Sequence, residues 1–195
     1  MTTTTDASTV QQSAGVRPAA TVGLAGAALS FVAWALMLGD PASGTALWYA
    51  GNAVGAAAMV GTTVLVVGLF AARETGSGNT GRGFLALWVL GLVLILAGGA
   101  QSLATGEQNS ILFPIGGITM SLGALVASIF IACNQALRGT ARRWAPLVYS
   151  VGMFGTAFFQ GEGHNLRINL ADLVGNLLQL MLAGVFFMGV RAAKR

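Results

Sequence analysis

The chain has 195 residues, of which 55% are hydrophobic and only 8% carry a charge, with a formal net charge of +4. Soluble domains average about 25% charged residues, so this chain has too few charges to cover a surface that faces water. The composition excludes an ordinary soluble domain and predicts an integral membrane protein that is all-α.

The first segment, residues 1–19, is rich in Thr, Ser and Gln and has little to bury, so we expect a disordered cytoplasmic tail. Residues 20–195 are expected to form a single transmembrane domain. An apolar run of about 18 or more residues is long enough to cross a bilayer. The predicted spans, of which the fifth is the shortest, are 21–39, 46–72, 83–104, 111–132, 144–159 and 168–190.

The charged residues predict how these six spans are oriented. When the segments alternate across the bilayer, one side receives Arg17, Arg73, Arg82, Arg138, Arg142, Arg143, Arg191, Lys194 and Arg195. The other side receives Arg167 together with Asp40, Glu107, Glu162 and Asp172. Basic residues accumulate on the cytoplasmic side, which predicts that both termini lie in the cytoplasm. We expect the bundle to lie in the inner membrane of a bacterial cell. The basic residues form no patch, so we expect no nucleic-acid binding.

The spans pair into three helical hairpins, and the even-numbered spans share features. Gly55 and Gly61 lie six residues apart in the second span, as Gly117 and Gly123 do in the fourth. This pattern resembles the HdeD-type acid-resistance membrane proteins, which are built from repeated transmembrane hairpins. The resemblance is carried by the turn at Asp40-Pro41, the stretch 51–61, and the basic exits at Arg73, Arg138 and Arg191. It implies a membrane role in stress tolerance and brings no catalytic motif.

Small residues form rows along the predicted helices, and such rows let membrane helices approach closely. The rows are Gly51/Gly55, Gly61/Gly68, Gly91/Gly98, Gly117/Gly123 and Gly152/Gly155. They predict close packing within the bundle or between subunits. The expected partners are therefore the lipid bilayer and either further copies of the chain or other membrane proteins.

Amides are the polar residues that fall within the apolar spans. Asn52 lies in the second span, Gln101 late in the third, and Asn176 and Gln179 lie three residues apart on one face of the sixth. One interpretation is hydrogen bonding between helices, at about 0.6 to 2 kcal/mol per bond. The other is a polar lining for a small ligand in the bundle core.

A second polar group is predicted in the outer loop before the sixth span. It comprises Glu162, His164, Arg167 and Asp172. One histidine near one carboxylate is a weak pattern for a metal, because metal sites usually need three or four ligands of defined type. We therefore predict no metal site and no cofactor. His164 could sense external pH, or the loop could simply be solvated.

Three functions remain open at this point. The absence of a catalytic constellation and the many packing rows favour a non-enzymatic accessory, stress-response or assembly protein. The alternative is a small-molecule channel, carrier or ligand-binding protein, which requires a cavity lined by Asn176 and Gln179. The third is an intramembrane enzyme acting on a lipid or isoprenoid, whose chemistry would have to come from Asp172, Glu162 or His164.

Overall fold

The computed structural model describes residues 7–76, 78–107, 110–134, 137, 139–157 and 166–192. Its regular secondary structure in these ranges is entirely α-helical, as the composition predicts. The helices are α1 (Ala7–Met37), α2 (Ala46–Ala71), α3 (Asn79–Thr105), α4 (Leu112–Cys133), α5 (Thr140–Ala157) and α6 (Leu166–Ala192).

The first helix begins well before the expected start of the first span at residue 21. It runs from Ala7 and includes Pro18, and the side chains of Val16 and Ala20 are fully buried. Proline inside a helix removes one backbone hydrogen bond, so packing of this segment against the bundle must supply the compensating stability. Residues 1–6 of the expected tail lie outside the described residues.

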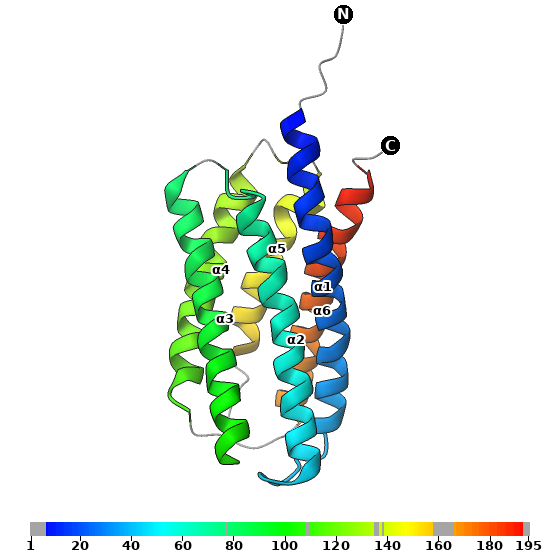
Figure 1. The fold of residues 1–195 in the computed structure, drawn as a ribbon, viewed down its shortest axis with the longest axis vertical. Helices are drawn as coiled ribbons and strands as arrows, with labels where there is room; N and C mark the ends of the chain where they lie inside the picture. The colour runs from blue at the N-terminus through cyan, green and yellow to red at the C-terminus, as the bar shows by residue number, and fades with distance from the viewer. Residues whose placement is uncertain are drawn as a thin grey trace, which may run out of the picture.

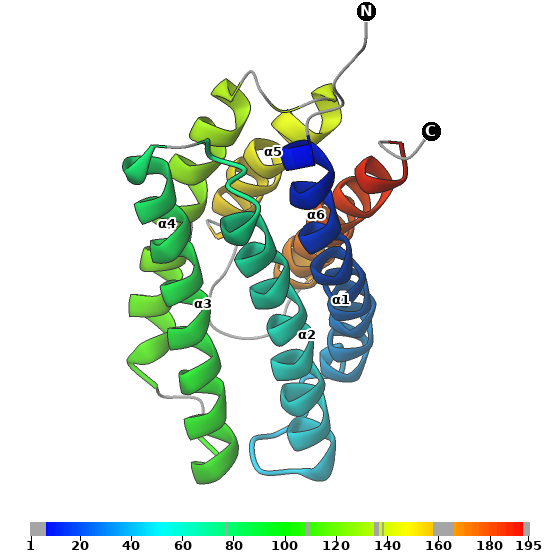
Figure 2. The ribbon, with the colours of Figure 1, turned by 45° about the horizontal axis from the view of Figure 1, so that its top comes forward.

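The helices form a closed ring in chain order. Each helix contacts the one before it and the one after it, and α6 closes the ring against α1. The closest pairs are α1 with α2 and α3 with α4, which are two of the three predicted hairpins. Figure 1 shows that α1 begins and α6 ends at the same end of the bundle, and Figure 2 shows α5 and α6 lying behind the α1–α2 pair.

Glycines set the close approach within these pairs. A Cβ on Gly26 of α1 would lie 2.8 Å from the Cα of Gly61 on α2, and one on Gly91 of α3 would collide with the backbone of Met120 on α4. No L side chain fits at either position without moving a helix. Most of the predicted glycine rows therefore pack against neighbouring helices of the same chain. The row on α4 differs from the prediction.

That row combines Gly116 with Gly123, and the predicted member Gly117 is not part of it. Cβ atoms on Gly116 and Gly123 would strike the backbone of α3, whereas one on Gly117 would meet nothing within 4 Å. The physical reason is helical periodicity: residues seven apart share a face, and residues six apart do not. Gly155, predicted to form a row with Gly152, likewise has open space where a Cβ would lie.

Five helices of the described chain are long and apolar enough to cross a membrane. They are Val16–Met37, Ala46–Ala71, Asn79–Thr105, Leu112–Cys133 and Asn169–Met188. Helix α5, which has 18 residues, is not among them, and its first turn contains Arg142 and Arg143. Large apolar side chains cover the outside of the bundle, with Ile118 on α4 72% exposed and Val151 on α5 55% exposed. A multi-pass helical membrane protein accounts for this surface.

The two ends of the bundle differ in charge. The described arginine side chains, Arg17, Arg73, Arg82, Arg142 and Arg143, lie where α1 begins and α6 ends, and we call this the arginine end. Asp40, Glu107 and Asp172 lie at the opposite end, which we call the cavity end for the reason given below. The buried core, which includes Leu65, Leu69, Leu85, Trp88, Leu182 and Phe186, fills the arginine half.

Candidate functional site

A partly open cavity of about 410 Å³ lies inside the ring of helices. All six helices contribute to its wall, mostly through residues between the cavity end and the midpoint of each helix, and on α2 the wall extends to Thr62. Ligand cavities commonly measure about 300 to 1,000 Å³, so this one is large enough for a small organic molecule. It ends toward the arginine end at Leu92 and Tyr149, which also belong to the buried core.

Apolar and polar groups divide the cavity wall between them. Its larger apolar side chains are Trp34, Met37, Met59, Leu92, Ile95, Leu96, Phe113, Met120, Tyr149 and Met153. Its polar side chains are Ser30, Asn52, Thr62, Thr156, Asn169, Asp172, Asn176 and Gln179. Most of the wall is therefore apolar, with a few polar groups that could orient a bound molecule.

Three of the four predicted amides line this cavity. Nδ2 of Asn52 donates to the carbonyl of Trp48 in its own helix at 2.9 Å. Nδ2 of Asn176 donates to the carbonyl of Ser30 on α1 at 3.3 Å, and Nε2 of Gln179 donates to Oγ1 of Thr62 on α2. The amides of α6 thus tie it to α1 and α2, and the same residues form part of the cavity wall.

The fourth amide, Gln101, is not part of the site. It is exposed near the end of α3, and its Oε1 accepts a hydrogen bond from the hydroxyl of Ser110 at 2.8 Å. Of the predicted loop group, Asp172 lines the cavity. Glu162 and His164 lie outside the described residues, as does the side chain of Arg167. Among the described residues, no three His, Cys, Asp or Glu side chains lie close enough together to hold a metal ion.

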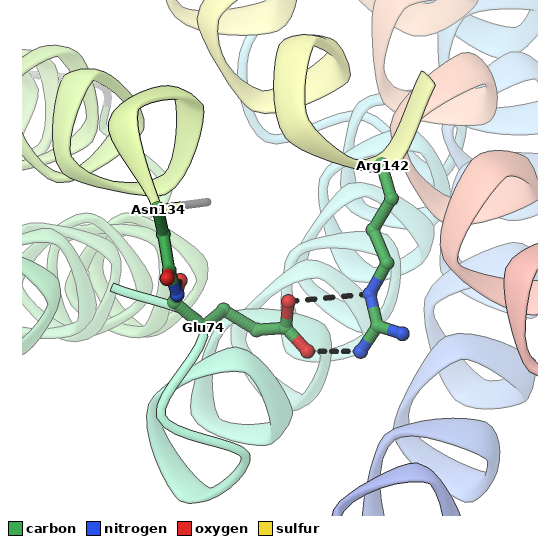
Figure 3. A network of polar contacts seen from close by, with 3 residues as sticks. All are labelled: Glu74, Asn134 and Arg142. Carbon is green, nitrogen blue, oxygen red and sulfur yellow. Dashed lines mark hydrogen bonds and ion pairs between the residues drawn. The ribbon is translucent and has the colours of Figure 1, made fainter. Parts of the chain in front are cut away.

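A polar cluster at the arginine end is absent from the sequence prediction. Glu74 follows α2 and is 1% exposed, and its carboxylate forms an ion pair with Arg142 at the start of α5. Asn134, just after α4, donates from Nδ2 to the backbone carbonyl of Glu74 at 2.9 Å. Figure 3 shows how these three residues join segments that are far apart in the sequence.

The same end of the bundle contains two further arginine contacts. The guanidinium of Arg143 donates from Nε and Nη2 to the carbonyl of Ala132, at 3.1 and 2.7 Å, which satisfies a free carbonyl at the end of α4. The guanidinium of Arg142 lies 5.6 Å from the ring centroid of Phe186 on α6. The cluster therefore connects α2, α4, α5 and α6.

Burial is the main influence on the pKa of the Glu74 carboxyl. Loss of hydration raises the pKa of its carboxyl above the ordinary value, and the neighbouring Arg142 opposes this shift without cancelling it. Neither residue lines the cavity. We therefore assign the pair to the packing of the helix ends and not to the candidate ligand site. Sequence gave no local signal for it, since the partners are 68 residues apart.

The chain is a multi-pass helical membrane protein, because its helices are long and apolar and its outer surface is apolar. One half of the bundle contains the cavity, which is the candidate ligand site. Comparison with known protein families, curated proteins and solved structures gives no match. The resemblance to HdeD-type proteins therefore stays a prediction.

Proposed function

We propose that the chain is an integral membrane protein that binds a small molecule in the cavity between its helices, as a ligand-binding protein or carrier. The observation that supports this is the cavity of about 410 Å³ lined by Asn52, Asn176 and Gln179. The sequence singles out these amides, because burying a polar group in an apolar span costs free energy unless the group forms hydrogen bonds.

The glycine rows that favoured an accessory or assembly role now support it less. Gly26, Gly61, Gly91, Gly116 and Gly123 are occupied by contacts within the chain. They therefore need no partner protein to explain them. An accessory role in stress response and association with other copies stay predictions.

We further propose that α5 also crosses the membrane, as the fifth of six spans, and that the arginine end faces the cytoplasm. Val148, Val151 and Phe154 expose an apolar face on α5 that resembles the lipid-facing sides of the other helices. The described arginine side chains lie at one end, in keeping with the accumulation of basic residues in the cytoplasm. The cavity then occupies the outer half of the bundle, in a bacterial inner membrane.

The proposal is tested by filling the cavity. Gly99 on α3 lines it and has nothing within 4 Å of the position where a Cβ would lie, so Gly99→Leu places a side chain in the space without a backbone clash. Gly117→Leu on α4 is the matched control, since its Cβ also meets nothing and the residue does not line the cavity.

The readout is native mass spectrometry of protein extracted gently from its own membrane, with the small molecules that dissociate from it identified. We expect the unmodified chain and Gly117→Leu to retain the same small molecule and Gly99→Leu to lose it. Retention by the unmodified chain and both variants, or by none of the three proteins under any extraction condition, would contradict the proposal.

A further inference from the structure

Tyr149 on α5 is the polar side chain at the floor of the cavity. It is 4% exposed, and it lines the cavity where the packed core begins. Its ring stacks on the fully buried Trp88 of α3, with the ring centroids 5.8 Å apart and the ring planes inclined by 21°. This contact holds the tyrosine ring between two helices, so the position of its hydroxyl is set before any ligand enters.

The Tyr149 hydroxyl forms no hydrogen bond with any described residue. Four buried polar atoms of the described chain also lack a partner and are closed off by the atoms around them: Thr75 Oγ1, Arg82 Nε, Trp88 Nε1 and Ser102 Oγ. The Tyr149 hydroxyl is not one of these, so it keeps open space beside it, and that space is the cavity. Because a buried tyrosine hydroxyl usually has a hydrogen-bond partner, this unpaired hydroxyl points to a ligand.

The side chains that share the deep end of the cavity with Tyr149 are apolar. Leu92 on α3 and Met120 on α4 are the wall residues of their helices nearest the arginine end, and Met153 lies one turn from Tyr149 on α5. None of the three carries a strong hydrogen-bond acceptor. The acceptor for the Tyr149 O–H therefore has to come from the ligand, whose remaining surface at this depth meets apolar side chains.

The other polar groups of the wall offer both donors and acceptors, and they favour no charge on the ligand. Asn52, Asn176 and Gln179 each donate one N–H to the protein and keep a second N–H and an oxygen. The side-chain amide of Asn169 adds a further group of the same kind. Asp172 already has an interaction within the chain, and the described lining residues include no Lys, Arg or His. A charged ligand would lose its hydration without gaining an opposite charge.

We infer that the cavity binds an uncharged, mostly apolar carbonyl compound, whose oxygen accepts a hydrogen bond from the Tyr149 hydroxyl at the cavity floor. The inference rests on the proposed function, because it names the class of molecule that the same cavity holds and the residue that recognises it. The apolar part of the ligand lies against the methionine and aromatic side chains of the wall, where burial of apolar surface supplies most of the affinity.

The test uses four probes that share a phenylalkyl skeleton: 4-phenylbutan-2-one, butylbenzene, 4-phenylbutan-2-amine and 3-phenylpropionate. At the same place they carry a ketone, no polar group, an ammonium and a carboxylate. Binding is measured by equilibrium dialysis against the full chain in nanodiscs of zwitterionic phosphatidylcholine, with empty nanodiscs as the blank. We expect the ketone to bind at least about tenfold more tightly than either charged probe, because burial of an unpaired charge is costly.

Tyr149→Phe is the decisive variant, because it removes the hydroxyl and keeps the ring that stacks on Trp88. It should weaken binding of the ketone by about fivefold, since a hydrogen bond between neutral groups contributes about that factor. Binding of butylbenzene should not change. Tyr49→Phe is the matched control: Tyr49 is exposed and does not line the cavity, so all four probes should bind as they do to the unmodified chain.

The inference is overturned if Tyr149→Phe weakens the ketone no more than Tyr49→Phe does, or if it weakens butylbenzene equally. It is also overturned if a charged probe binds as tightly as the ketone, or if no probe binds. A melting temperature of Tyr149→Phe below that of Tyr49→Phe would contradict it as well, because the hydroxyl would then be bonded within the protein.

Failure here is distinguishable from failure of the proposed function. A chain that binds none of the four probes, yet loses a co-purified molecule on Gly99→Leu and keeps it on Gly117→Leu, still binds a ligand, but one of another class.

Discussion

The same six helices pack differently in the two halves of the bundle. In the arginine half, Leu65, Trp88 and Phe186 are fully buried, and the Glu74–Arg142 ion pair joins the helix ends. In the cavity half, the ring of helices encloses about 410 Å³ edged by amides. The packed half contains most of the buried apolar residues that stabilise the fold, which leaves the other half free to remain hollow.

The largest expected effect comes from breaking the ion pair of the packed half. Arg142→Ala leaves the buried Glu74 carboxylate without its partner, and such a loss costs about 3–5 kcal/mol. For a chain of this size the apparent melting temperature should fall on the order of 10 °C, measured by circular dichroism in a mild detergent. The exposed Arg73→Ala is the control. Equal melting temperatures of the two variants would mean that the pair does not stabilise this end.

A smaller effect on the melting temperature is expected when a glycine that contacts a neighbouring helix is compared with one that faces the cavity on the same helix. Gly91→Ala on α3 pushes a methyl group against the backbone of Met120, whereas Gly99→Ala extends into the cavity. Overpacking typically costs about 1–3 kcal/mol, so Gly91→Ala should lower the melting temperature by several degrees. Gly99→Ala should leave it unchanged or raise it slightly, because alanine favours a helix by up to about 1 kcal/mol over glycine. The reverse order would show that the cavity is not where the structure places it.

The smallest expected effect is a dependence of stability on pH. Burial raises the pKa of Glu74 in the folded chain, so the folded state binds the proton more tightly than the unfolded state does. The stability that this group contributes is full below the ordinary carboxyl pKa and is lost as the pH rises through the raised folded value. Melting curves of the unmodified chain should show this decline, and Glu74→Gln should remove that part of it. An unchanged decline in Glu74→Gln would assign it to another group.

The sequence predicted the helices better than their ends. Spans at 46–72 and 111–132 agree closely with α2 and α4, because long apolar runs leave little choice. Helix α5 starts at Thr140, four residues before the predicted span, because Arg142 and Arg143 find partners in Glu74 and the carbonyl of Ala132. Hydropathy alone predicts that two adjacent arginines lie in a loop.

The candidate site was predictable only in part. Asn52, Asn176 and Gln179 stand out in the sequence because an amide in an apolar span needs a hydrogen-bond partner, either in the protein or in a ligand. All three line the cavity. Gln101 lies near a helix end, where water or a loop residue such as Ser110 can satisfy it, and it does not line the site. Neither the void itself nor the burial of Glu74 has a local signal, because both depend on side chains from helices far apart in the sequence.

The most direct test of a hollow half beside a packed half compares two positions on α6. Asn176→Cys lies on the cavity wall, and Leu182→Cys lies in the fully buried core less than two turns further along. With the exposed Cys133 changed to Ser, the chain in nanodiscs is treated with methyl methanethiosulfonate, a small neutral thiol reagent, and labelling is followed by mass spectrometry. The account predicts rapid labelling at position 176 and little at position 182. Equal labelling rates, or faster labelling at position 182, would contradict it.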